Sequence, residues 1–484
     1  MFDFQFECDN TITLIDRPPV VSREIKPVWA EELNILGIDR FYKYPHECEA
    51  PLLWSCANRY YYRGDKVFEV KYIDCDTPPE IKVFSSLYQS FEPVKIGDLV
   101  NRNKALMDRL IGETKETIRD TLQNDQFLSL KVVCCFSGGK DSAVLLDLMA
   151  QSCDDFVCLF ENTGMEFSET VEEFGRISKK YDSNRILFLT ANPVKKPHEL
   201  WDLIGYPTRV HRWCCRVCKS GPGTQLISKV LGDFSCLYVT GQRAEESVAR
   251  SKYSLFARGE LNNWNFRPIL KWSSAEVWLY LLWKIKIFNT RYRKGSKRVG
   301  CVLCPLSFRA KNWIESHSGG AVLQNLRAIV EKNYYRENFT EGNWVGGKDG
   351  LSLKNNPPRF FDDGQKIHKL APFSVADWLI PAGLNPCEDL PKAEKKYIIK
   401  SLYCVSCGLC VGRCSAGAIS IIDGVLRINP NKCCHCRECL KADPKRGDVC
   451  FAYSRRKIPR KETVEWCKNN GFANLLSLPK AAEL

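Results

Sequence analysis

The sequence lacks any apolar run long enough for a membrane-spanning helix, which needs about eighteen or more such residues. The nearest candidate, Val277–Phe288, is interrupted by Lys284 and Lys286. The N-terminus, MFDFQFECDN, also lacks a basic start followed by an apolar stretch, so no signal peptide is visible. We therefore expect a cytoplasmic protein that has no membrane partner.

Cysteine, in contrast, is abundant: the 484 residues include 25 cysteines, and nine of them lie between Cys404 and Cys450. Secreted chains use cysteines for disulfides, whereas a cytoplasmic chain of this size uses so many for metal or redox chemistry. The formal net charge of +13 favours polyanionic partners such as nucleotides, RNA or DNA. A solvated basic surface is the alternative explanation of the charge.

The length of the chain predicts several domains. Leu106, Leu110 and Ile118 recur at helical spacing and predict a connecting helix at about 103–124. The expected regions are an N-terminal accessory domain (1–100), the connecting helix (101–130), a catalytic domain (131–320), a linker with helices (321–395), a cysteine-dense domain (396–455) and a basic tail (456–484).

From residue 131 the pattern alternates between strands and helices. Short apolar runs predict strands, and longer amphipathic stretches predict helices. The expected strands are 132–136, 156–160, 185–190 and 236–240, and the expected helices are 143–150 and 170–180. This alternation predicts an α/β domain that has a parallel sheet with helices on both faces.

A glycine-rich loop, Ser137-Gly138-Gly139-Lys140-Asp141-Ser142, lies between the first of these strands and its helix. Unpaired N–H groups at a helix N-terminus bind anions, and glycines let the backbone approach a phosphate closely. Lys140 adds a positive charge, the serines add hydroxyl donors, and Asp141 could help bind Mg²⁺. The loop is not a Walker loop, which has a longer spacing before its Gly-Lys pair. We expect this loop to bind the phosphate groups of a nucleotide.

The SGGKDS loop after a buried strand resembles the PP-loop superfamily, an adenine nucleotide alpha hydrolase-like fold that includes pyrophosphatases and sulfonucleotide reductases. Two later segments resemble the family in the same order: 161–167, with Thr163 and Gly164, and 241–250, with Arg243 and Arg250. The resemblance covers about residues 130–310 and implies that the loop and these side segments bind an adenine nucleotide. A surface ion pair is the alternative role of either arginine.

Five cysteines inside this domain resemble the cluster site of the 4Fe–4S sulfonucleotide reductases and of the DNA-phosphorothioation member of the superfamily. They are Cys214, Cys215, Cys218, Cys301 and Cys304. The resemblance implies a cluster held by Cys214, Cys301 and Cys304, with either Cys215 or Cys218 as the fourth ligand. Zinc is the alternative metal, because thiolates bind both iron–sulfur clusters and zinc.

Near the C-terminus the spacing C-x2-C-x2-C-x3-C is followed by a second C-x2-C-x2-C, which is the pattern of bacterial ferredoxins with two 4Fe–4S clusters. The resemblance implies a small α+β ferredoxin-like domain, with a short hairpin at 417–428 between the runs. In that family the fourth cysteine of each run binds the other cluster. The implied ligands are Cys404, Cys407, Cys410 and Cys450 for one cluster, and Cys414, Cys433, Cys436 and Cys439 for the other.

Two features depart from the ferredoxin pattern. Ser415 stands where ferredoxins usually have proline, and ten residues separate Cys439 from Cys450. His46, Cys48 and Cys56 in the N-terminal region have no standard ligand spacing, so we interpret them as structural. The whole layout resembles archaeal-type reductase-like proteins of the phosphoadenosine phosphosulfate (PAPS) family that carry ferredoxin modules.

The resemblance implies an iron–sulfur oxidoreductase that acts on adenylyl sulfate (APS) or PAPS with electrons that an electron donor delivers through the clusters. The Glu-Cys-Gly-Leu-His motif, which supplies the nucleophilic cysteine of the family reductases, is absent, so no catalytic residue is assigned. ATP-dependent sulfur transfer to RNA or DNA is the alternative, since ATP suits the same loop. A nucleotide-sensing electron-transfer protein without turnover is a third alternative.

Overall fold

The computed structural model describes two compact units of the chain. Its described residues are 2–21, 23–73, 77–84, 87–181, 185–197, 199–200, 214–232, 235–259, 263–302, 404–434 and the positions 304, 313–314, 317, 436, 439, 465 and 468–469. The first unit comprises Met1–Phe160, Glu166–Leu189 and Ser235–Gly342. The second comprises Glu161–Met165, Thr190–Phe234 and Asn343–Leu484.

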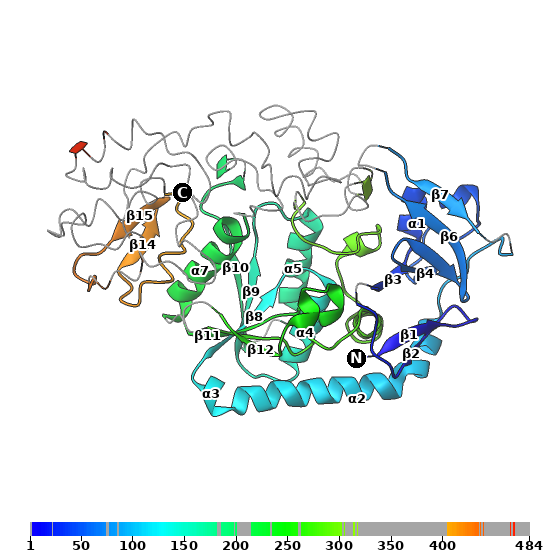
Figure 1. Cartoon of the computed structure of the whole chain (residues 1–484), viewed down its shortest axis with the longest axis horizontal. Helices are drawn as coiled ribbons and strands as arrows, with labels where there is room; N and C mark the ends of the chain where they lie inside the picture. The colour runs from blue at the N-terminus through cyan, green and yellow to red at the C-terminus, as the bar shows by residue number, and fades with distance from the viewer. Residues whose placement is uncertain are drawn as a thin grey trace. The chain divides into compact units, whose positions relative to one another are not determined.

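A six-stranded sheet organises the α/β region (Figure 1). The strands are β8 (Lys131–Phe136), β9 (Phe156–Glu161), β10 (Ile186–Ala191), β11 (Cys236–Val239), β12 (Phe256–Arg258) and β13 (Trp264–Phe266), in the spatial order β10-β9-β8-β11-β13-β12. Strand β8 is parallel to β9 and β11, and β11 is parallel to β13. The predicted parallel sheet is therefore confirmed. The antiparallel edge strand β12 was not predicted, because three residues are too few to display an alternating pattern.

Helix α2 (Ile96–Gln123) runs along this region and packs against the helices α4 (Lys140–Ala150) and α8 (Ser274–Tyr280). It begins seven residues before the predicted start at 103. Leu110 and Ile118 are buried as their spacing indicates, but the buried stripe also contains the polar residues Asn103, Thr114 and Thr121. The Thr114 hydroxyl is satisfied there, because it donates to the Leu110 carbonyl at 2.7 Å.

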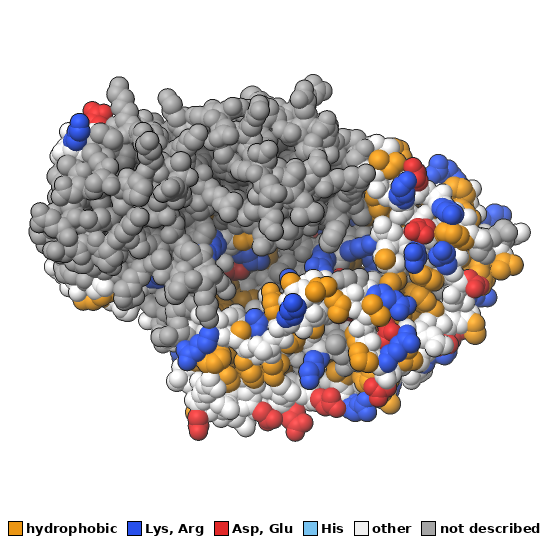
Figure 2. Space-filling view, viewed as in Figure 1, with side chains coloured by type: hydrophobic (Ala, Val, Ile, Leu, Met, Phe, Trp, Pro, Cys, Tyr) orange, Lys and Arg blue, Asp and Glu red, His pale blue; other side chains and the backbone are white. Residues whose placement is uncertain are grey.

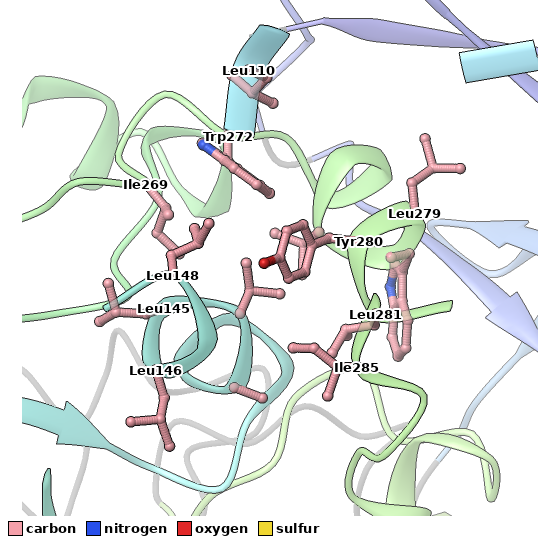
Figure 3. Packing of buried hydrophobic residues seen from close by; sticks show 14 of the residues in the cluster. Leu110, Leu145, Leu146, Leu148, Ile269, Trp272, Leu279, Tyr280, Leu281 and Ile285 are labelled. Atoms are coloured by element: carbon pink, nitrogen blue, oxygen red, sulfur yellow. The ribbon is translucent and has the colours of Figure 1, made fainter. Parts of the chain in front are cut away.

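The core of the first unit lies where α4 meets α8 and the residues that follow it (Figure 3). Leu145, Leu146 and Leu148 of α4 are completely buried. The ring of Trp272 contacts that of Tyr280, with centroids 5.7 Å apart, and donates its Nε1–H to Thr114 of α2 at 3.0 Å. Burying one such leucine stabilises the fold by about 1.5–3 kcal/mol. This packing fixes the helix that carries the glycine-rich loop.

The N-terminal region contains a five-stranded antiparallel sheet in the order β3-β4-β5-β6-β7. Its elements are β3 (Ile25–Val28), α1 (Ala30–Leu36), β4 (Leu53–Cys56), β5 (Arg59–Tyr62), β6 (Asp65–Lys71) and β7 (Glu80–Val83). A separate hairpin of β1 (Asp3–Phe6) and β2 (Ile12–Ile15) packs through β2 against α2. These contacts join the N-terminal region to the α/β region within one unit.

The second unit contains α7 (Gly221–Leu231) and the hairpin of β14 (Ile419–Ile422) and β15 (Val425–Ile428). Asp423 and Gly424 form its two-residue turn, both with positive φ, which is the conformation that joins such strands tightly. The hairpin expected between the two cysteine runs is therefore present, while the complete ferredoxin-like fold is not established. Over the described residues, no helix combines the length and the apolar character that a membrane span requires.

Replacing Asn103 by Ala tests how the N-terminal hairpin is attached. The Asn103 side chain accepts the Leu14 N–H at 2.7 Å and donates to the carbonyls of Ile12 at 2.8 Å and Leu99 at 2.9 Å. Its loss leaves buried backbone groups unsatisfied, so we expect destabilisation by about 1–3 kcal/mol and faster hydrogen exchange of the Leu14 amide. The exposed neighbour Asn101→Ala is the control. Equal Leu14 exchange in both variants would contradict this attachment.

Candidate nucleotide and cluster sites

The glycine-rich loop occupies the turn between β8 and α4. Gly138 has φ +71°, and Gly139 is the N-cap of α4. A Cβ atom on Gly138 would collide with the Cγ2 methyl of Thr170 on α5 (Ser168–Lys180). Both the backbone angle and the close approach therefore require glycine. The loop presents the N-terminus of an eleven-residue helix, which favours anions.

Hydrogen bonds within the loop hold its shape. The Ser142 hydroxyl accepts the N–H of Ser137 at 3.2 Å and donates to the Gly139 carbonyl at 2.8 Å. The backbone N–H of Lys140 donates to the hydroxyl of the buried Tyr292 at 2.9 Å. The predicted serines thus shape the turn in this structure, and the tyrosine hydroxyl lies beside the helix N-terminus where an anion would bind.

Arg243 is the centre of a buried charge network beside the loop. Its guanidinium is fully buried and forms ion pairs with Asp141 at 2.5 Å, with Glu245 at 2.7 Å and with Glu24. Burial alone would lower the pKa of Arg243, but the carboxylates outweigh it and raise the pKa well above its usual value. Arg243 therefore positions three acidic side chains, and an incoming ligand meets it only after a rearrangement.

Lys140 is also buried and pairs with Asp141 at 2.8 Å and with Glu24 at 3.7 Å. Burial acts to lower its pKa, and the charges of Asp141 and Glu24 outweigh burial and raise it. The amine is consequently positively charged at neutral pH. Lys140 and Arg243 thus supply two fixed positive charges at the start of α4.

Two further arginines lie on the more exposed side of this network. Arg298 pairs with Glu24 at 3.1 Å and with Glu246 at 3.8 Å. Arg250 also pairs with Glu246. Both arginines keep about a third of their side-chain surface exposed, in contrast to Arg243. Of the arginines predicted from sequence, Arg250 is thus the more accessible one.

Sequence reasoning missed Glu24, Tyr292 and Arg298. Each is remote in sequence from the loop, and no motif accompanies any of them. Two predicted residues, Thr163 and Gly164, belong to the second unit, whereas the loop and the arginines belong to the first. In the second unit Gly164 has φ +76° and lies against Pro197. The role predicted for Thr163 and Gly164 stays a prediction.

The five internal cysteines are divided between the units. Cys214, Cys215 and Cys218 belong to the second unit, and Cys301 and Cys304 to the first. Cys214 and Cys218 are buried, Cys215 is exposed, and the other two are partly buried. Within the described residues, no three His, Cys, Asp or Glu side chains are placed closely enough to hold a metal ion. The choice between Cys215 and Cys218 therefore stays open.

The cysteines of the C-terminal module show features that suit thiolate ligands. The Cys404 sulfur accepts the N–H of Ser406 at 3.3 Å, and the Cys414 sulfur accepts the N–H of Ala418 at 3.1 Å. Such N–H···S bonds stabilise and tune cluster thiolates. Burial raises the pKa of Cys439 to about 12, and the neighbouring thiols that contribute are those of Cys414, Cys433 and Cys436.

These four cysteines are the second predicted ligand set, and thiolates are the donors that iron–sulfur clusters use. The described residues bring no three of them close enough to hold a metal ion, so this ligand set stays a prediction. In the first set, burial raises the pKa of Cys407 to about 12, and the neighbouring thiol of Cys404 contributes to this rise. The fourth ligand predicted for that set, Cys450, lies outside the described residues. The number of clusters is therefore a prediction.

Within the second unit, the first cysteine run lies against the helical segment that follows Cys214. A Cβ atom on Gly221 would overlap the carbonyl oxygen of Cys407. Gly408, with φ +82°, also lies close to Gln225 of α7, since a Cβ there would lie 2.6 Å from the Gln225 Oε1. The loop of the C-terminal module is thus packed next to the segment that carries Cys215 and Cys218.

Replacing Gly138 by Ala tests the phosphate loop. The substitution forces an alanine into positive φ and against Thr170, at a cost of about 1–3 kcal/mol. We expect ATP binding, measured by calorimetry, to weaken roughly tenfold. Gly112→Ala in α2 is the control, because nothing lies within 4 Å of its added Cβ. Unchanged affinity in Gly138→Ala would show that the loop does not hold the nucleotide.

Comparisons with known proteins agree with this geometry. Residues 131–307 match the family model of the phosphoadenosine phosphosulfate reductase domain. The chain is 31% identical over 222 residues to an uncharacterized protein of Methanocaldococcus jannaschii, a match that covers 45% of this chain and 52% of that protein. The chain thus spans about half the length of this relative.

Two other comparisons concern named activities. The chain is 25% identical over 196 residues to the adenosine 5'-phosphosulfate reductase of Geobacillus kaustophilus, covering 38% of this chain and 79% of that enzyme. The solved U34-tRNA thiolase NcsA of Methanococcus maripaludis, with its 4Fe–4S cluster, aligns at 15% identity and a TM-score of 0.31, covering 57% of this chain and 87% of that one. The family match and the parallel sheet support a PP-loop α/β domain of the phosphoadenosine phosphosulfate reductase type at residues 131–307.

Proposed function

We propose that the protein is an iron–sulfur oxidoreductase that reduces an adenine sulfonucleotide, APS or PAPS, in the α/β domain. The observation that carries the proposal is the SGGKDS loop at the N-terminus of α4, with Lys140 and Arg243 beside it. A helix N-terminus and fixed cations favour a sulfate or phosphate group. The similarity to an APS reductase favours a sulfonucleotide as the ligand.

The reduction would convert the sulfate of the nucleotide to sulfite. The S–O bond to the nucleotide breaks, two electrons reduce the sulfur, and the nucleotide leaves with the bridging oxygen. The residues of this chain would bind and orient the nucleotide, because the loop N–H groups and Lys140 would hold its anionic part. Arg250 and Arg298 would balance the negative charge that develops on the leaving nucleotide. An external donor of electrons is required.

Iron–sulfur clusters, when bound, supply electrons one at a time. The chain would hold them with the two ligand sets of the C-terminal module and with the internal cysteines. The packing of Cys407 against Gly221 supports an electron route, because it brings the first run next to the segment of Cys218. The nucleophilic cysteine motif of the family reductases is absent from this sequence, so the cysteines of the predicted ligand sets are the residues that would hold the groups supplying the electrons.

ATP-dependent thiolation of a nucleic acid is the second candidate. The carboxylate of Asp141, 2.8 Å from Lys140, favours it, because ATP chemistry usually needs Mg²⁺ and carboxylates bind that ion. On the face shown in Figure 2, basic and acidic side chains are interspersed over the described residues. The reductase remains the first candidate because of the similarity to APS reductases.

Sulfite release separates the two candidates. The protein is purified anaerobically, reduced, and supplied with labelled APS and PAPS in parallel. We expect sulfite from one of them, and the preferred nucleotide identifies the substrate. Absence of sulfite from protein that carries its full iron would reject the reductase, and labelled sulfur incorporated into RNA or DNA in the presence of ATP would then establish thiolation.

A pair of adjacent cysteines tests the cluster assignment. Cys433 is in the predicted second ligand set, whereas its exposed neighbour Cys434 is not. We expect Cys433→Ser to lower the iron content by about four atoms per chain and to remove one electron paramagnetic resonance signal of the reduced protein. Cys434→Ser should retain both. Equal iron loss in the two variants would contradict the assignment.

A further inference from the structure

The charge network beside the phosphate loop contains as many cations as carboxylates. Its cations are Lys140, Arg243, Arg250 and Arg298, and its carboxylates are Glu24, Asp141, Glu245 and Glu246. A sulfate or phosphate group entering this partly buried site would add uncompensated negative charge, which is costly away from water. One carboxylate must leave when such a group binds, or a cation must enter with it.

Glu24 is the carboxylate best placed to leave. It precedes β3 in the N-terminal region, whereas the other three carboxylates belong to the loop or to the segment after β11. Its side chain is also the most exposed of the four, at 21%, against 18% for Asp141 and 1% for Glu245. The backbone beside it is anchored, because the Ile25 N–H donates to the Ser274 hydroxyl at 2.9 Å. Glu24 would therefore leave by rotation of its side chain, which breaks its ion pairs with Lys140, Arg243 and Arg298.

The contacts of Glu24 are those that an oxyanion would make. One carboxylate oxygen faces Lys140 and Arg243, and the other accepts from Arg298. If Glu24 moves away, Asp141 still pairs with Lys140 and with Arg243, and Glu246 still pairs with Arg298. Lys140 and Arg298 would then keep one carboxylate partner each and Arg243 two, and each cation would regain capacity for a new oxygen ligand.

We propose that Glu24 is an internal stand-in for the oxyanion of the ligand, and that the sulfate or phosphate of an adenine nucleotide displaces it. This inference rests on the proposed function, because it assumes that a nucleotide binds at the SGGKDS loop. Both a free inorganic anion and a nucleotide must displace Glu24, but only the nucleotide offsets this cost through contacts of its adenosine part. Glu24 thus lowers the affinity of the site for every oxyanion, so that an anion without such contacts binds weakly.

Calorimetry with sodium sulfate and with ATP, each without Mg²⁺, tests this role on the full chain. Glu24→Gln removes the charge and keeps the size, so we expect both ligands to bind about tenfold or more tightly than to the wild type. Because both ligands displace the same carboxylate, the gain for sulfate should be similar to that for ATP. Glu47→Gln, an exposed carboxylate of the N-terminal region, is the control and should bind as the wild type does.

The outcomes separate this inference from the proposed function. Weaker or unchanged binding in Glu24→Gln, while the wild type binds ATP, would overturn the inference, since Glu24 would then only position the cations. If neither the wild type nor any folded variant binds ATP or sulfate, the proposed nucleotide site itself fails.

Discussion

The ion pairs of Arg243 are the interaction on which the rest of the structure depends. This fully buried guanidinium joins the N-terminal region through Glu24, the phosphate loop through Asp141 and the segment after β11 through Glu245. Removing one partner of a buried charge pair typically costs about 3–5 kcal/mol, because the other charge is left uncompensated. The same arginine therefore stabilises the fold and fixes the electrostatics of the site. A substitution that displaces any of these segments would therefore change the ion pairs beside the nucleotide loop.

The N-terminal region is consequently part of the site. The buried Asn103 attaches the β1–β2 hairpin to α2. The Ser274 hydroxyl accepts the N–H of Ile25 at the start of β3, and this bond fixes the backbone next to Glu24. Arg298, from the segment after α8, also pairs with the Glu24 carboxylate. A domain that looked accessory in sequence thus supplies a charge at the point where the ligand would bind. In the second unit, the contact between Cys407 and Gly221 brings the two cysteine-rich segments together.

The sequence predicted the features that depend on local patterns. The strand before Ser137, the glycine-rich turn and the hairpin around Gly424 each follow from short-range propensity and appear in the structure. Long-range partners could not be predicted, because nothing near Glu24 or Tyr292 indicates that either meets a loop more than a hundred residues away. Polar residues on the buried face of α2, such as Asn103, also escape a hydrophobic pattern. The fold was therefore more predictable than the charge balance of the site.

The central claim is that the N-terminus of α4 holds the anionic part of an adenine nucleotide. The most direct measurement is a crystal structure of the anaerobically purified protein with APS. The account predicts the sulfate or phosphate group within hydrogen-bond distance of the Lys140 amine and the Gly139 N–H, with Glu24 turned away. Nucleotide bound elsewhere, with the Lys140, Arg243 and Glu24 ion pairs intact, would contradict it.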